Sequence, residues 1–196
     1  MTFLRNKPDK KKYILHAVTA AAVIAVVLVI DLLTKALVVD LAVENGMPEN
    51  GTYFRLATVI EGFFYITYIQ NTGAAWSIGG GSDVFMTVVI VLTFVAVTVI
   101  LAVIYFPDKR KNLFFVVGLA LIAGGAVGNL VDRLMLGYVR DFLDFYPFGY
   151  NFPVFNVADM SLVVGVIMTV ICILVFFFKP EKKVESENAD GGGDAA

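Results

Sequence analysis

Four long apolar runs constrain what this chain can fold into. The clearest extends from Val84 to Phe106, 23 residues without a charge. At about 1.5 Å rise per residue it would form a helix of roughly 35 Å, long enough to cross a bilayer. Charged residues make up only 16% of the chain, whereas soluble domains carry roughly 25%. The chain is therefore predicted to be an integral membrane protein.

The pattern predicts a membrane all-α bundle of four transmembrane helices in a single domain over residues 1–178, followed by a disordered cytoplasmic tail over 179–196. The first run follows a basic start, but it is too long for a cleavable signal peptide, and further spans follow it. The expected spans cover residues 14–39, 84–106, 113–131 and 157–178.

The third span has a regular face of small residues. Ala120, Gly124 and Gly128 recur every four positions. Such a face lets another helix approach closely within a membrane. We therefore expect the third span to pack tightly against a neighbouring helix.

The basic residues indicate how the chain crosses the membrane. Of the 15 Lys and Arg residues, five precede the first span, three lie between spans two and three, and three follow span four. By the positive-inside rule both termini are predicted to be cytoplasmic. The loops 40–83 and 132–156 would then lie outside.

Both outer loops have a distinctive composition. Residues 52–70 include an alternating, aromatic-rich run that predicts a small antiparallel extracytoplasmic β-cradle, with an outer loop or short helix near it. The second loop is dense in aromatics from Phe142 to Phe155. Apolar rings beside acidic residues suggest a ligand that carries lipid.

Polar and ionisable side chains near the span ends recur at helical spacing, so each set can share one helix face. Ionisable residues in spans are costly and by default indicate function. These sets are Asp31 with Lys35, Asn129 with Asp132 and Arg133, and Asn156 with Asp159.

Two interpretations of these residues remain open. Asp31 with Lys35, and Asp132 with Arg133, can pair and simply hold the bundle together. Asp141, expected on a short connection, and Asp159, expected at a helix start, have no obvious sole partner and are better candidates for chemistry. A pair of carboxyl groups held close shares a proton, so one can act as base and the other as acid.

Other catalytic groups fit less well. Cys172 lies 13 residues beyond Asp159, about 20 Å along a helix, and with the single His16 it is expected toward the cytoplasmic half. One histidine and one cysteine exclude a His-rich metal site and an internal disulfide. A Ser77–Lys35 pair stays open as an alternative.

Four short motifs in this order resemble those of lipoprotein signal peptidase, the signal peptidase II family, over residues 14–178. They are Asp31 with Thr34 and Lys35; Asn71-Thr-Gly-Ala-Ala-Trp76; Gly128-Asn-Leu-Val-Asp-Arg133 followed by Gly137, Val139, Asp141 and Phe142; and Phe155-Asn-Val-Ala-Asp159. Leu32 and Trp76 depart from the family pattern, which usually has a polar residue and phenylalanine at these positions.

The resemblance implies an aspartic endopeptidase of the bacterial inner membrane. It would cleave signal peptides from prolipoproteins on the amino side of a cysteine that carries a diacylglyceryl group. Asp141 and Asp159 match the catalytic dyad. Residues expected to bind or orient the substrate are Asn71, Gly73, Asn129, Asp132, Arg133, Asn156, Ala158, Asp31 and Lys35.

The expected partners are a lipidated prolipoprotein and membrane lipids, with no nucleic acid, no metal and no cofactor. The chain is expected to act as a monomer with its active site near the outer face.

The alternative functions are a small four-helix transporter or channel and an assembly protein. A proton or ion path should leave polar residues through the middle of the membrane, and spans two and four are apolar there.

Overall fold

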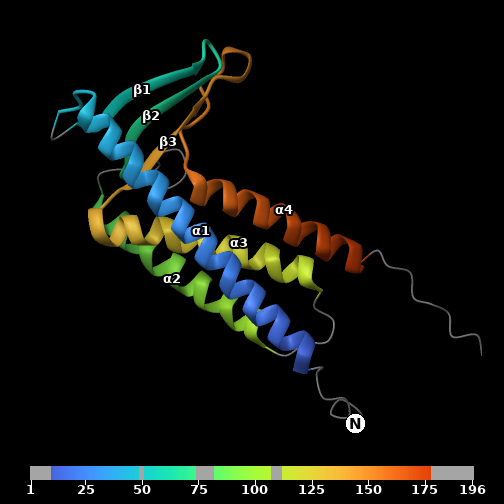
Figure 1. Cartoon of the computed structure of the whole chain (residues 1–196). Coiled ribbons are helices and arrows are strands. Elements are labelled where there is room, and N and C mark those ends of the chain that lie inside the picture. Colours follow the sequence, from blue (N-terminus) through green and yellow to red (C-terminus); the bar gives the residue numbers. More distant parts are fainter. Residues whose placement is uncertain (1–9, 49–50, 74–81, 107–111, 178–196) are drawn as a thin grey trace, which may run out of the picture.

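The computed structural model describes residues 10–48, 51–73, 82–106 and 112–177. Within these ranges four helices are long and apolar enough to cross a membrane, which confirms the predicted bundle (Figure 1). They are α1 Lys10–Glu44, α2 Asp83–Tyr105, α3 Leu113–Leu136 and α4 Val157–Phe177. The predicted tail over 179–196, Trp76 and Ser77 lie outside the described residues.

Two spans are longer than predicted. α1 continues to Glu44 instead of 39, and α3 continues to Leu136 instead of 131. The predicted ends followed the apolar runs, whereas α3 ends where Gly137 caps it. Gly137 adopts a left-handed φ of 80° and donates its N–H to the carbonyl of Arg133. Glycine is the residue that takes this conformation without strain. Asp132 and Arg133 therefore lie on the helix and not in the outer loop.

α3 is the central helix of the bundle. About 56% of the residues in its 18-residue apolar stretch are buried inside the protein. The corresponding shares for α1, α2 and α4 are 22%, 11% and 17%. It packs against each of the other three helices (Figure 1). The other three helices therefore present most of their surface to lipid.

The predicted small-residue face of α3 packs against α1, which confirms the expected close approach. A Cβ atom at Gly124 would lie 3.0 Å from the Cβ atom of Val27, and one at Gly128 would lie 2.6 Å from an Asp31 carboxylate oxygen. Ala120 is fully buried in the same interface. Gly128 thus leaves room for a buried carboxylate between the two helices.

A second pair of glycines brings α3 and α4 together. A Cβ atom at Gly165 would lie 2.6 Å from the carbonyl oxygen of Gly118, and one at Gly118 would lie 3.1 Å from the carbonyl oxygen of Gly165. The two backbones are therefore in direct contact.

A three-stranded antiparallel sheet lies at the C-terminal end of α1 (Figure 1). Its strands are β1 Tyr53–Ile60, β2 Phe64–Asn71 and β3 Val139–Phe145, in the order β1-β2-β3. The first two occupy the predicted cradle region. β3 was not predicted, and Asp141 lies on it and not on a short connection. A single 3₁₀ turn, Pro147–Gly149, follows β3.

The two faces of this sheet differ in chemistry. On one face Phe64 stacks on Phe145 with ring centroids 4.3 Å apart, and Phe145 stacks on Phe155 at 5.7 Å. On the other face the buried Asp144 carboxylate accepts a hydrogen bond from the Thr67 hydroxyl at 2.7 Å. Asp141 and Asp144 are three positions apart, so the alternation of a strand turns them to opposite faces.

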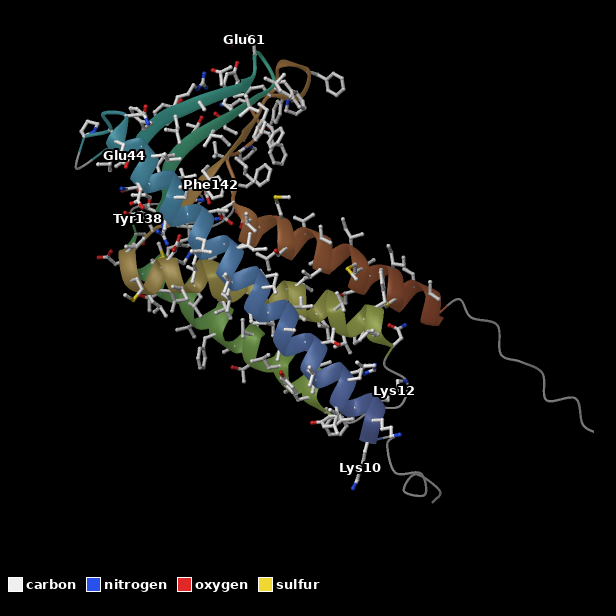
Figure 2. The ribbon with its side chains drawn as sticks, in the orientation of Figure 1. Lys10, Lys12, Glu44, Glu61, Tyr138 and Phe142 are labelled. Carbon is white, nitrogen blue, oxygen red and sulfur yellow. The ribbon has the colours of Figure 1, made fainter. Side chains whose placement is uncertain are left out.

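An apolar cluster anchors the sheet to α1. Val38 and Ala42 of α1, Tyr68 of β2 and Phe142 of β3 are all buried together. Figure 2 shows Phe142 where the sheet meets α1, near Glu44, with Lys10 and Lys12 at the opposite end of the helix. Because Phe142 is the next residue after Asp141, this cluster also fixes the position of Asp141 relative to α1.

The contact between α3 and α4 yields a first prediction. Gly165→Val should lower the free energy of unfolding by about 1–3 kcal/mol, since overpacking costs that much and here the new atoms would overlap backbone. Thermal unfolding in detergent would measure the loss. Val166→Leu, at the adjacent lipid-exposed position, is the matched control and should unfold like the wild type. A Gly165→Val protein as stable as the control would contradict this packing.

Candidate active site

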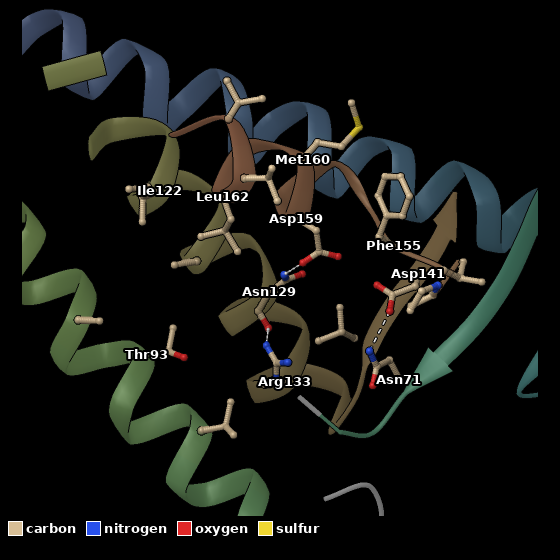
Figure 3. Close-up of a pocket in the computed structure, with 18 of the residues that line it drawn as sticks. Asn71, Thr93, Ile122, Asn129, Arg133, Asp141, Phe155, Asp159, Met160 and Leu162 are labelled. Carbon is tan, nitrogen blue, oxygen red and sulfur yellow. Dashed lines mark hydrogen bonds between the residues drawn. The ribbon is translucent and has the colours of Figure 1, made fainter. Parts of the chain in front are cut away.

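Asp141 and Asp159 reach one cleft from different parts of the chain. Asp141 lies on β3 and Asp159 lies in the first turn of α4. Both line a cleft of about 750 Å³. Figure 3 shows them near one another, with Asn71, Asn129 and Arg133 around them. The structure therefore brings the two predicted acids into one site.

Asp159 is held by the start of α4. The backbone N–H of Asn156 donates to Asp159 Oδ2 at 3.1 Å, and the backbone N–H of Asp159 donates to Asn156 Oδ1 at 3.0 Å. This reciprocal pair has the form of a capping box with aspartate as the acid. It satisfies two N–H groups at the helix start and places the carboxylate at the positive end of the helix dipole.

Asp141 is held by side-chain amides in a more buried place. Its Oδ1 accepts from Asn156 Nδ2 at 2.7 Å and its Oδ2 accepts from Asn71 Nδ2 at 3.0 Å, and the residue is only 3% exposed. Burial raises the pKa of the Asp141 carboxyl to about 7, and the charge of Asp159 adds to the rise, while the two amide hydrogen bonds oppose it. Asp141 can therefore hold a proton near neutral pH.

Two asparagines join the acids into one network. Asn129 Nδ2 donates to Asp159 Oδ1 at 2.7 Å, and Asn156 Nδ2 donates to Asn129 Oδ1 at 3.0 Å. Asn156 thus contacts both acids, and Asn129 contacts Asp159 and Asn156. The structure thus brings both asparagines together with the two acids.

Behind the asparagines lies a buried cluster of charges. Lys35 Nζ is 2.8 Å from Asp31 Oδ2 and 3.3 Å from Asp132 Oδ2, and all three side chains are fully buried. It also donates to Asn129 Oδ1 at 3.0 Å. The predicted Asp31–Lys35 pair is therefore present, and it is part of a larger set.

One interpretation left open was that Asp132 pairs with Arg133, and the ion pairs of the described residues do not include that pair. Asp132 binds Arg140, whose Nη2 lies 2.7 Å from Oδ1 and whose Nε and backbone N–H both donate to Oδ2. Adjacent residues on a helix point in different directions, so Asp132 faces β3. Sequence reasoning did not select Arg140 for the site. The available signal was a cation directly next to the candidate acid Asp141 in the sequence.

The remaining predicted residues line or support the cleft. Arg133 lines it, donating to the carbonyl oxygens of Gly73 at 3.3 Å and Asn129 at 3.4 Å, and its buried Nε has no hydrogen-bond partner among the described residues. Ala158 is fully buried, and its backbone N–H donates to Asp31 Oδ1 at 2.9 Å. Ala158 therefore ties the start of α4 to α1.

Apart from its polar end, the cleft is apolar. α2 lines it at positions spaced three or four apart, so one face of this helix forms a wall. The wall residues of α2 are Val89, Thr93, Ala96 and Ile100. Ile122 and Ala126 of α3 and Leu162 and Val163 of α4 line it as well. The acids thus lie at the end of an apolar trough bordered by three membrane-spanning helices.

The alternative catalytic groups are not assembled in the described part of the chain. Cys172 Sγ lies 3.7 Å from Asn112 Oδ1, and Asn112 caps the start of α3, at the opposite end from Asp132. Lys35 is engaged by three partners, and Ser77 lies outside the described residues. Residues 10–48, 51–73, 82–106 and 112–177 contain no group of three His, Cys, Asp or Glu side chains that could hold a metal ion.

Comparison with known proteins identifies a family. The family model described as signal peptidase (SPase) II matches residues 23–175. The lipoprotein signal peptidase of Staphylococcus haemolyticus is 37% identical over 166 residues, which cover 84% of this chain and 95% of that protein. The lipoprotein signal peptidase of Enterococcus faecalis is 42% identical over 125 residues, covering 63% of this chain and 70% of that protein.

Two solved structures, each of a bacterial membrane enzyme, have a similar fold. One has a TM-score of 0.68 at 35% identity and covers 85% of this chain and 94% of its own. The other has a TM-score of 0.63 at 35% identity, covering 80% and 92%. Both cover at least 80% of this chain, so the likeness extends over most of its fold.

The buried position of Asp141 predicts a pH-dependent stability. Folding raises the pKa of this carboxyl from 3.8 to about 7, so the folded state binds its proton more tightly than the unfolded state. The resulting stabilisation is present below about pH 4 and is lost as the pH rises through about 7. From pH 4 to 8 the wild type should lose free energy of unfolding relative to Asp141→Asn, on the order of 4 kcal/mol.

Thermal unfolding across this pH range would measure that difference. Leu143→Ile, on the same strand and without a titratable group, is the control, and its difference from the wild type should not change with pH. If the difference in free energy of unfolding between the wild type and Asp141→Asn also does not change with pH, the result would contradict a raised pKa of Asp141.

Proposed function

This chain belongs to the signal peptidase II family, and on that basis we propose that it is an aspartic endopeptidase that cleaves signal peptides from prolipoproteins with Asp141 and Asp159 as its catalytic dyad. The observation that carries the proposal is the pair of acids, held by shared asparagines, at the end of an apolar trough. The protein is a multi-pass membrane protein with four candidate spans.

The substrate fits the chemistry of the trough. A diacylglyceryl-modified prolipoprotein has an apolar signal segment and acyl chains, both of which partition into the bilayer. It could enter laterally between α2 and α4, whose facing side chains are aliphatic. The aromatic face of the sheet, with Phe145 and Phe155, would cover the lipid beside the cleaved bond.

The proposed reaction is attack by water on the peptide carbonyl on the amino side of the lipidated cysteine. One acid takes a proton from the water as its oxygen bonds to the carbonyl carbon, and the other gives a proton to the carbonyl oxygen. The tetrahedral intermediate then loses its amine after that nitrogen is protonated. Two carboxyl groups sharing one proton suit both steps.

The polar groups around the dyad would orient the substrate. Arg133 has an unused buried N–H at Nε, and Asn71 and Asn156 present amides beside Asp141. Donors placed where negative charge develops stabilise the oxyanion. Gly73 and Ala158 place backbone next to these groups without a bulky side chain.

We propose that the enzyme lies in the bacterial inner membrane with both termini cytoplasmic, since basic residues concentrate at the ends and in the loop between spans two and three. The dyad then lies near the outer face, and the chain acts as a monomer. The transport alternative is not favoured, because the relatives are lipoprotein signal peptidases and the fully buried charges Asp31, Lys35 and Asp132 gather near one end of α3.

The dyad yields a cleavage prediction. Asp141→Asn and Asp159→Asn should each lower cleavage of a diacylglyceryl-modified prolipoprotein at least about a hundredfold, since each removes an acid–base group. A gel-shift assay in lipid with chelator present would measure it. Asp144→Asn is the matched control, a buried aspartate three positions along the same strand on its other face. It should cut within a few fold of the wild type. Retained cleavage in either dyad variant would rule out the assignment.

A further inference from the structure

Lys35 is fully buried and its ammonium contacts three oxygen atoms. They belong to Asp31 at 2.8 Å, Asn129 at 3.0 Å and Asp132 at 3.3 Å. An ammonium has three N–H donors and no acceptor, so these contacts use its full capacity. Neither acid of the proposed dyad is among them.

The ammonium dictates how the Asn129 carboxamide is turned. Asn129 Oδ1 accepts from Lys35 Nζ and from Asn156 Nδ2, both at 3.0 Å. A flipped carboxamide would set its own NH₂ against the ammonium, donor against donor. The Asn129 NH₂ must therefore point the other way, where it donates to Asp159 Oδ1 at 2.7 Å.

The same arrangement orients Asn156. Its Nδ2 donates to Asn129 Oδ1 and to Asp141 Oδ1, so its own Oδ1 is left to accept the backbone N–H of Asp159. Lys35 thus determines, through two amides, which donors reach each acid.

The two acids are left unequal. Asp159 accepts a backbone N–H at a helix start, where the dipole favours a negative charge, and it is partly exposed. Asp141 is 3% exposed, lies on a strand, and accepts only side-chain amides among the hydrogen bonds described. An ionised carboxylate is therefore stabilised more at Asp159, and a neutral one at Asp141.

We propose that Lys35 is a positioning residue that fixes the proton of the dyad on Asp141 and leaves Asp159 ionised, so that Asp159 is the base and Asp141 the acid. This assignment rests on the proposed function, because it divides the roles within that dyad. Asp159 takes the proton of the attacking water while Asp141 protonates the carbonyl oxygen. Asp159 then protonates the leaving nitrogen as the C–N bond breaks, and a hydroxyl of the intermediate returns a proton to Asp141.

The charges facing Lys35 come from three packed elements. Asp31 lies on the same helix, Asp132 on α3 and Arg140 on β3, where its guanidinium binds Asp132 at 2.7 Å. These two anions and two cations balance. A variant that removes Lys35 alone would leave a buried negative charge and could fail to fold, so the test removes Asp31 with it.

The position of the proton can be tested without substrate. Infrared spectra of the protein in lipid at about pH 6 should contain the C=O band of a protonated, buried carboxyl group. We expect this band to vanish in Asp141→Asn and to persist in Asp159→Asn. The reverse pattern would overturn the assignment. Because no cleavage is needed, this result stands apart from the test of the proposed function, which is cleavage by the wild type.

The role of Lys35 is tested by two double variants, with Asp31→Asn alone as the reference. In Asp31→Asn/Lys35→Met, position 35 has no hydrogen-bond donor for Asn129 Oδ1. In Asp31→Asn/Lys35→Gln, position 35 keeps a neutral donor. For the Met variant we expect kcat to fall about tenfold or more with KM within twofold, and the acidic limb of the pH profile to move to higher pH because a nearby cation is lost. The Gln variant should recover part of kcat.

Thermal unfolding would establish that all three variants are folded before the rates are compared. A folded Met variant whose kcat and pH profile match those of Asp31→Asn would show that Lys35 serves packing alone and would overturn the proposal.

Discussion

The burial of opposite charges between α1, α3 and β3 is the interaction on which the rest of this structure depends. Lys35, Asp31 and Asp132 are fully buried near one end of the bundle. Breaking one member of such a set leaves an uncompensated charge, which costs about 3–5 kcal/mol. The helices must therefore meet in one register. Gly128 supplies the space for the Asp31 carboxylate, and the backbone N–H of Ala158 binds that carboxylate and sets the start of α4.

The candidate active site is built on this cluster from two kinds of structure. Asp159 is fixed by the capping geometry of a helix, and Asp141 by a strand that an apolar cluster anchors to α1. Asn129 and Asn156 connect the two acids and leave them in different surroundings. A helix end favours ionisation, whereas a buried strand favours the neutral acid. The asymmetry that the proposed acid–base chemistry requires thus follows from the secondary structure that carries each residue.

The trough and the sheet place this chemistry where a lipid-bearing peptide could reach it. One face of α2 and parts of α3 and α4 supply aliphatic walls, and the aromatic face of the sheet lies above them. Asp144 and Thr67 lie on the opposite face of the sheet. Membership in the signal peptidase II family and this apolar trough beside aromatic rings lead to the same substrate class.

The sequence alone determined the four spans, the close approach at Ala120, Gly124 and Gly128, and the residues of the candidate site, because apolar length and helical spacing are local properties of the chain. It missed β3, left open whether Asp132 pairs with Arg133, and passed over Arg140, which binds Asp132. Those features depend on residues distant in sequence: Lys35 meets Asn129 across 94 positions, and Asp31 meets Ala158 across 127. Only the tertiary structure decided which charge each buried group faces. In a low-dielectric interior a charge is stabilised by the partner that packing brings within hydrogen-bond distance, and this partner need not be a neighbour in sequence.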